Sequence, residues 1–189
     1  MDCIEGKCIF DLKMHKEHDV ALILFKDFTR LMCDTFPIFP LDTSNLQRGK
    51  MLCRLGYPFP EFTNFEYDED KDLIKWNDTG RKATPLFPSE GMLTRFVSDN
   101  QGDRFAFELS TPGLRGQSGG PAFDIEGKVW GMQFQTVHLD LDFDVDQEVL
   151  RSGISKRVTD SAFLHVGRCI HIDVLKTFMS ENNVSFKEE

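Results

Sequence analysis

A glycine-rich stretch around Ser118 is the part of the sequence best suited to chemistry. Residues 113–124 read GLRGQSGGPAFD, with four glycines around one serine. Glycine costs conformational entropy in a folded chain, so such a cluster indicates special backbone dihedrals or the close approach of another segment. We therefore expect Ser118 to lie in a tight turn whose amides are not covered by side chains.

The chemistry that this pattern predicts is nucleophilic attack by the Ser118 hydroxyl. A serine needs a neighbouring base to remove its proton, and the oxyanion that forms on the attacked carbonyl needs preorganised donors. The N–H groups of Gly116 and Ser118 are placed to point into one hollow and form this oxyanion hole. Gly119 and Gly120 would let the following strand pass close behind. An ordinary glycine-rich turn is the alternative.

The elements that must position Ser118 are predicted to be mostly β-strands. Short apolar runs alternate with Gly, Pro, Asn and Asp, as in all-β barrels and sandwiches. A single helix is predicted over residues 172–180, where apolar residues recur at helical spacing and Asp173 lies in the first turn. The predicted strands cover residues 8–14, 19–25, 50–57, 92–97, 104–110, 121–125, 128–136 and 163–171.

Two acidic stretches resemble insertions between these strands. Residues 61–90 read as a long acidic surface loop, and residues 138–160 contain Asp140, Asp142, Asp144 and Asp146 at a period of two. On a strand these four carboxylates would share one face, which suits either a calcium site or a solvated surface. An EF-hand loop needs Gly at its sixth and Glu at its twelfth position, where this stretch has Val145 and Arg151. We therefore expect no metal site here.

Composition and charge narrow the classes of partner. The chain has 189 residues and a net charge of −9 without a basic stripe, so we expect no nucleic-acid partner. No apolar run reaches membrane-spanning length, and the first residues lack a signal-peptide core, so we expect no membrane contact. The scattered cysteines form no CxxC pair, which indicates reduced thiols, a cytoplasmic location and no cysteine-bound metal. They are Cys3, Cys8, Cys33, Cys53 and Cys169.

The serine motif and the strands around it resemble the trypsin-like serine peptidases of the chymotrypsin fold, in the style of disulfide-free bacterial and intracellular members. Residues 163–180 are similar to that family's last strand and terminal helix, and the likeness covers residues 8–180. Four further stretches carry it in the family's order: HDVALILF (18–25), RGKMLCRLGYPF (48–59), GMLTRF (91–96) and PGLRGQSGGPAFDIEGKVWGMQFQT (112–136).

The resemblance implies an all-β, chymotrypsin-like barrel with a C-terminal helix. Residues 1–47 would be the end of a first barrel and the inter-barrel linker. Residues 48–181 would form an essentially complete second barrel, with the acidic insertion 61–90 and the helix, followed by a tail over residues 182–189. The first barrel would be only partly present.

The resemblance also implies hydrolysis of peptide bonds through an acyl-enzyme on Ser118. Asp19 would be the aspartate of the catalytic triad, and the amides of Gly116 and Ser118 would hold the oxyanion. This chemistry needs no metal and no organic cofactor. The expected partner is a peptide or protein substrate.

The specificity pocket implied by the resemblance is walled by residues 112–117 and by the strand 133–136. Pro112 stands where trypsin has an aspartate, so we expect no strong preference for Arg or Lys. Arg115 either lines the pocket or is simply exposed to solvent. The substrate backbone would pair with the strand over residues 134–136. The implied substrate-binding residues are Pro112, Arg115, Gln133, Phe134 and Gln135.

The histidine base of the family has no counterpart at the expected place. It normally precedes the aspartate by several strands, but here 18 residues precede Asp19. His15 and His18 lie too close along the chain, and on an extended segment His18 points away from Asp19. We therefore expect a C-terminal portion of a longer protease domain, with an upstream segment supplying the histidine, or a protein that has lost it.

Two other functions remain open from the sequence. One is a catalytically inactive, protease-like module that binds peptides or partners in the same groove. The other is a generic esterase, because GQSGG fits the pattern G-x-S-x-G. That nucleophile elbow requires a helix after the serine, whereas the residues after Ser118 read as a strand.

Overall fold

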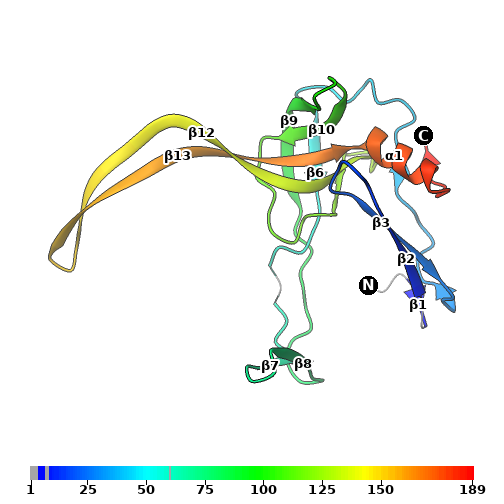
Figure 1. The fold of residues 1–189 in the computed structure, drawn as a ribbon, viewed down its shortest axis with the longest axis horizontal. Coiled ribbons are helices and arrows are strands. Elements are labelled where there is room, and N and C mark those ends of the chain that lie inside the picture. Colours follow the sequence, from blue (N-terminus) through cyan, green and yellow to red (C-terminus); the bar gives the residue numbers. More distant parts are fainter. Residues whose placement is uncertain (1–3, 7–8, 60) are drawn as a thin grey trace.

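The computed structural model describes residues 4–6, 9–59 and 61–189, which fold mostly into β-strands with a single α-helix among them (Figure 1). This confirms the predicted all-β class. In chain order the elements are β1 (Ile4–Glu5), β2 (Ile9–Met14), β3 (Ala21–Lys26), β4 (Arg30–Leu31), β5 (Ile38–Phe39), β6 (Met51–Arg54), β7 (Phe65–Asp68), β8 (Leu73–Trp76), β9 (Ser89–Ser98), β10 (Arg104–Leu109), β11 (Pro121–Phe123), β12 (Val129–Arg151), β13 (Ile154–His171), α1 (Ile172–Glu181) and β14 (Lys187–Glu188).

Six strands close into a barrel that forms the body of the molecule. Their order is β10-β13-β12-β11-β6-β9. The last strand, β9, pairs with the first, β10, which closes the barrel and gives each strand two neighbours. All these pairings are antiparallel. The loop that carries Ser118 connects β10 to β11 and therefore crosses one end of the barrel.

The barrel interior is filled by the alternate, inward-facing residues of its strands. Leu52 and Arg54 of β6 are buried while Met51 is exposed, which is the period of two that a pleated strand imposes. Complete burial of one large apolar side chain contributes about 1.5–3 kcal/mol, so this cluster is a main source of stability. The cluster consists of Leu46, Leu52, Leu93, Phe107, Leu109, Ala122, Trp130 and Cys169, with Phe96 packed against it.

A second apolar cluster joins the N-terminal hairpin and α1 to the outside of the barrel. Its buried members are Val20, Ile170 and Phe178, and Leu22 is one of the half-buried residues packed around them. The helix α1 is capped by His171, whose Nδ1 accepts a hydrogen bond from the Asp173 amide at 3.2 Å. It spans Ile172–Glu181, one residue beyond the predicted range.

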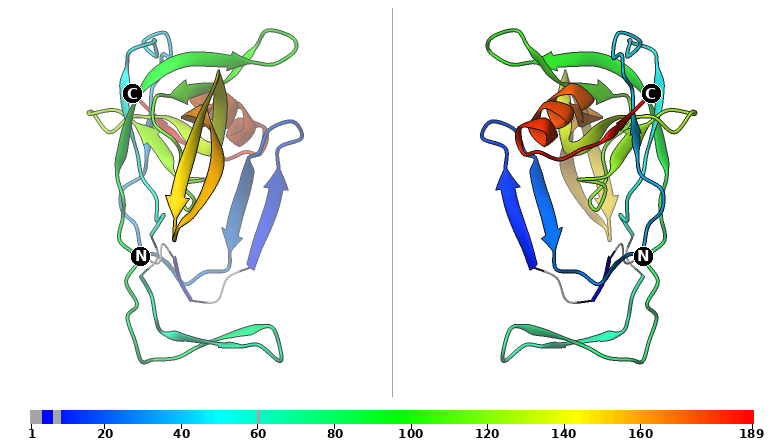
Figure 2. Two further views of the ribbon diagram at one scale, coloured as in Figure 1. Left: turned by 90° about the vertical axis from the view of Figure 1, so that its left-hand side faces the viewer. Right: turned by 90° about the vertical axis from the view of Figure 1, so that its right-hand side faces the viewer.

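The N-terminal strands β2 and β3 pair with each other, from Ile9↔Lys26 to Met14↔Ala21. In the described part of the chain they join no larger sheet. The hairpin stands beside the barrel and extends away from α1 (Figure 2). Large apolar side chains are exposed along it: Ile9, Phe10, Leu12, Met14, Ile23 and Phe25.

Residues 138–160, predicted to be an insertion, continue the barrel strands. β12 and β13 run on past the barrel and form a long two-stranded arm (Figure 1). Asp142 has φ 56°, and the register shifts between Asp140 and Asp144. The period of two in the four aspartates is therefore interrupted within the arm.

The other predicted loop and the tail also contain strands. Within residues 61–90, β7 and β8 form a hairpin at the end of the long excursion from the barrel (Figure 1). Residues 187–188 of the expected tail form β14, which pairs in parallel with β5. Across the described residues, no helix is long and apolar enough to cross a lipid bilayer.

Candidate functional site

Ser118 lies in a turn that requires glycine on both sides. Gly116 and Gly119 have φ values of 87° and 84°, in the left-handed region that side chains disfavour. The Gly116 carbonyl accepts a hydrogen bond from the Tyr57 amide at 2.9 Å, and a Cβ on Gly116 would collide with the Tyr57 carbonyl. The Ser118 residue is exposed. The sequence thus forms the tight turn that was predicted.

The backbone amides of this turn divide into two groups. Among the residues that the structure describes, the N–H groups of Gly116 and Ser118 have no hydrogen-bond partner. These two are the predicted oxyanion donors. Three neighbouring amides are paired: Gln117 donates to Leu114 O (3.0 Å), Gly119 to Gln133 O (2.8 Å) and Gly120 to Gln117 O (2.9 Å). The amides of Gly113 and Arg115, before the turn, also have no partner within the described residues.

The buried side chain of Gln117 anchors the turn through two hydrogen bonds. Its Oε1 accepts from the Leu114 amide at 2.9 Å, and its Nε2 donates to the Ser89 hydroxyl at 3.0 Å. Gln117 is fully buried, whereas Ser118 next to it is exposed. This residue was not among the predicted site residues, although a polar residue between two turn glycines was a signal for it.

Arg54 is a second residue that the sequence analysis missed. Its fully buried guanidinium donates from Nη1 to Gln133 Oε1 at 2.7 Å and from Nη2 to Thr111 Oγ1 at 2.6 Å. Nη2 also reaches the carbonyls of Thr111 and Pro112, both at 3.0 Å. Burial lowers the pKa of Arg54, and no carboxylate within the described residues pairs with it. It ties the start of the serine loop to β12.

The predicted substrate-binding residues are divided between the interior and the surface. Gln133 is buried, and its Nε2 donates to the Gln135 carbonyl at 2.7 Å. Phe134 is half-buried in the second apolar cluster. Pro112, Arg115 and Gln135 are exposed. Gln133 and Pro112 share Arg54 as a hydrogen-bond donor, so these two predicted residues do lie together.

The residue after Asp19 and the serine turn are both associated with the same short stretch of β12. Val20, which follows Asp19, is buried in the cluster that Met132 and Phe134 line. Gln133 lies between Met132 and Phe134 in the chain, and its carbonyl accepts a hydrogen bond from the Gly119 amide of the serine turn. Asp19 itself is exposed in the bend before β3, and its carboxylate has no hydrogen bond or ion pair within the described ranges.

The five histidines have other partners. His15 Nδ1 accepts from the amides of Glu17 and His18 at 3.1 Å, and the His18 ring stacks on Phe105 at 4.9 Å. Burial, and then the charge of His15, lowers the pKa of His18. His138 and His165 contact each other. In residues 4–6, 9–59 and 61–189, no histidine has a hydrogen bond with Ser118 or Asp19.

The described cysteines are not placed for chemistry. Cys33, Cys53 and Cys169 form no disulfide, and burial raises the pKa of Cys169 to about 12. The Cys169 thiol therefore stays protonated at neutral pH. Cys3 and Cys8 lie outside the described residues. The described chain gathers no group of three or more His, Cys, Asp or Glu that could hold a metal ion.

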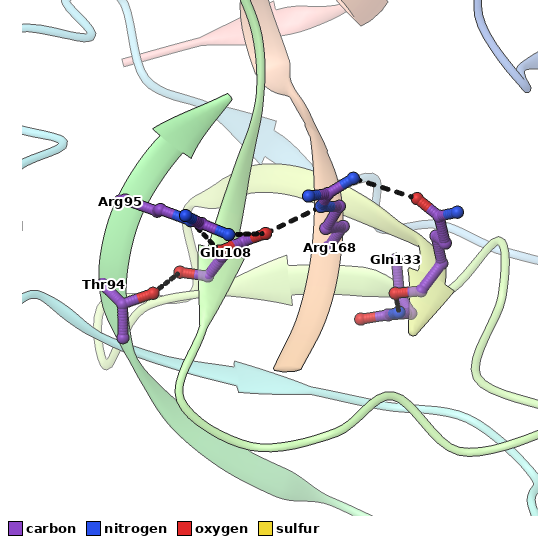
Figure 3. A network of polar contacts seen from close by, with 6 residues as sticks. Thr94, Arg95, Glu108, Gln133 and Arg168 are labelled. Carbon is purple, nitrogen blue, oxygen red and sulfur yellow. Dashed lines mark hydrogen bonds and ion pairs between the residues drawn. The ribbon is translucent and has the colours of Figure 1, made fainter. Parts of the chain in front are cut away.

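A charged network lies on β12, β13, β10 and β9 beside Gln133 (Figure 3). The nearly buried Glu108 accepts from Arg168 Nε at 2.8 Å and from Arg95 Nη2 at 3.1 Å, and Arg95 Nε also contacts it. Burial alone would raise the pKa of Glu108, but the hydrogen bonds from Arg95 and Arg168 outweigh it and lower the pKa. Glu108 is therefore ionised. Arg168 Nη1 also reaches Gln135 Oε1 at 3.5 Å.

No protein-family model matches this chain, and no curated protein matches it.

Proposed function

We propose that this chain is a trypsin-like serine endopeptidase domain in which Ser118 cleaves peptide bonds. The observation that carries the proposal is that the amides of Gly116 and Ser118 have no partner among the described residues and belong to a turn in which Ser118 is exposed. Free backbone N–H groups next to a nucleophile are the donors that an oxyanion hole supplies, so these two amides suit an anionic ligand. The closed antiparallel barrel with a terminal helix supports the chymotrypsin-like assignment.

In the proposed mechanism, a histidine from outside this chain removes the proton of Ser118. Asp19 holds the histidine ring in the required tautomer, and Ser118 attacks the peptide carbonyl. The Gly116 and Ser118 amides bind the developing oxyanion, which is worth about 3–4 kcal/mol per donor in such sites. The histidine then protonates the leaving amine, and water hydrolyses the acyl-enzyme.

The β2–β3 hairpin is the surface on which the segment with this histidine would dock. Within the described part of the chain its two outer edges are unpaired, and Phe10 and Met14 are among its exposed apolar side chains. Unpaired strand edges with exposed apolar faces favour pairing with further strands. Asp19 lies at the turn of this same hairpin, so a docked segment would bring its histidine to the aspartate.

A peptide-binding module without catalysis is the second candidate. It is favoured by the engagement of all five histidines with groups other than Ser118. The same turn and the neighbouring strand β12 would then serve binding alone.

Labelling with a fluorophosphonate probe tests the proposal. The chain would be reacted alone, with added imidazole as a substitute base, and as a fusion with the polypeptide encoded upstream, with Ser118→Ala as the control. We expect labelling at Ser118 that increases with imidazole or in the fusion, and none in Ser118→Ala. Absence of labelling in every form, with retained peptide binding, would favour the binding module.

A further inference from the structure

Four residues on four neighbouring strands form one continuous cross-strand row. Arg95 of β9 is opposite Glu108 of β10, Glu108 is opposite Arg168 of β13, and Arg168 is opposite Gln135 of β12. Residues directly opposite each other on adjacent strands project from the same face of a sheet. The hydrogen bonds along the row follow this register (Figure 3).

The row contains two arginines and one carboxylate, so it carries a net charge of one positive unit. Arg95 alone contacts Glu108 through both Nε and Nη2 and so neutralises its carboxylate. Arg168 adds a second guanidinium through Nε, and 24% of its side chain remains exposed. This local excess of positive charge lies on a chain whose net charge is −9.

The row ends at an open strand edge. β12 pairs with β11 only from Val129 to Met132, and Gln133 then bonds to Gly119 and Gly120. Beyond Gln133, the only strand paired with β12 in the described chain is β13. An extended peptide that pairs with this edge would place one of its side chains opposite Gln135, as the next member of the row.

We propose that the open edge of β12 binds an extended acidic peptide, with a Glu or Asp opposite Gln135 that is recognised by the Arg168 guanidinium. This inference rests on the proposed peptide groove and names its substrate class. Arg168 extends toward Gln135, and a new strand lies about 4.8 Å beyond β12, within reach of an Arg–carboxylate pair. Arginine binds carboxylates strongly because its planar fork donates two parallel hydrogen bonds. Glu108 holds Nε and Gln135 contacts Nη1, so within the described residues Nη2 of that fork is left without a partner.

A measurement of peptide affinity tests this inference independently of catalysis. The Ser118→Ala chain would be titrated into fluorescein-labelled Thr- and Ser-rich peptides in which a single Glu is moved through every position. Each peptide has a partner with Gln at the same place, and fluorescence anisotropy gives the affinity. We expect one position at which Glu binds at least about tenfold tighter than Gln, the range of a charge-assisted hydrogen bond.

Variants of the row assign this preference to Arg168. Arg168→Gln is expected to reduce the Glu/Gln ratio to within about twofold of one while leaving the affinity for the Gln peptide unchanged, because only the charge-assisted bond is lost. Arg168→Lys should keep part of the preference. The double variant Glu108→Gln/Arg168→Gln removes the buried carboxylate with its partner and should lose the preference in the same way. Arg157→Gln, on the distant arm, is the matched control and should bind as the parent does.

Each outcome is decisive. Equal affinity for Glu and Gln peptides at every position would overturn the acidic specificity but leave a peptide groove in place. A preference that survives in both Arg168→Gln and the double variant would also overturn it. Failure to bind any of the peptides would instead contradict the groove of the proposed function.

Discussion

Arg54 Nη1 donates a hydrogen bond to Gln133 Oε1 at 2.7 Å, with neither side chain open to solvent. This contact joins β6 to β12, 79 residues apart in the chain. Through Nη2, the same guanidinium holds the two carbonyls at which the serine loop begins. The position of the Ser118 turn therefore depends on a buried cation at the end of a barrel strand.

Arg54→Met tests this dependence. The methionine fills similar volume but leaves the Pro112 carbonyl without its donor and Gln133 Oε1 with only the weak Cys169 thiol, while the Thr111 carbonyl keeps the Gly167 amide. We expect a loss of about 2–4 kcal/mol in the free energy of unfolding, because buried unsatisfied acceptors cost about 1–3 kcal/mol each and relief of the buried charge offsets part of that cost. Urea unfolding measures it. Arg115→Met, at an exposed position, is the control and should change stability by less than about 0.5 kcal/mol.

Gly116→Ala should disturb the turn more than a matched glycine elsewhere. Gly127 has φ 81°, close to the 87° of Gly116, but a Cβ there meets no atom within 4 Å. We expect Gly127→Ala to cost about 1–2 kcal/mol from backbone strain alone. At Gly116 the collision with the Tyr57 carbonyl adds to this strain. Equal losses in thermal unfolding of the two variants would contradict the close approach of Tyr57 to the turn.

Stability should fall as the pH is lowered from 7 toward 5.5. Burial lowers the pKa of His171, and the charges of Arg104 and Lys176 act in the same direction against Asp173. The folded pKa lies below the unfolded value of 6.5, so the unfolded chain binds more protons as pH falls through 6.5, and the folded state loses stability. His18 adds to this loss in the same sense.

His171→Asn isolates the His171 part of this effect. Asparagine is a good N-cap, so its side chain can still accept the Asp173 amide. We expect a smaller loss of stability between pH 7 and 5.5 in urea unfolding than for the parent chain. An unchanged pH dependence in that window would show that His171 is not held neutral by burial.

The β12–β13 arm should be dispensable for the barrel. Asp140 and Phe163 are register partners at its base, so an Asn-Gly turn can replace residues 141–162. Most side chains beyond that point are exposed, and we expect the unfolding free energy to change by less than about 1 kcal/mol. A substantially larger loss would mean that the arm supports the barrel.

The features with a local signal were predictable from the sequence. The period of the apolar residues and Asp173 in the first turn placed α1 to within one residue. Short apolar runs predicted the barrel strands. The glycines around Ser118 predicted a tight turn, because its backbone dihedrals favour glycine. The trypsin-like resemblance, the roles of Asp19 and Ser118 and the domain division of residues 1–47, 48–181 and 182–189 stay predictions.

The features that depend on distant contacts were not predictable. Arg54 occupies an inward position of β6, two residues after Leu52, but nothing local indicates that Gln133 and Thr111 would satisfy its donors. The arm was missed because its strands are exposed on both faces. Apolar residues alternate with aspartates over residues 139–146, which is a strand signal, but the acidic stretch was interpreted as an insertion between strands.

The free amides beside Ser118 can be observed directly by NMR in the presence of imidazole, as the substitute base, and a peptidyl boronic acid, which adds to a serine hydroxyl and places a negative oxygen next to it. We predict an adduct on Ser118 with large downfield shifts of the Gly116 and Ser118 amide protons, small shifts at Gln117 and Gly119, and none of these changes in Ser118→Ala. An adduct that leaves the Gly116 and Ser118 amides unshifted would contradict the proposed oxyanion hole, and failure to form any adduct would contradict the role of Ser118 as nucleophile.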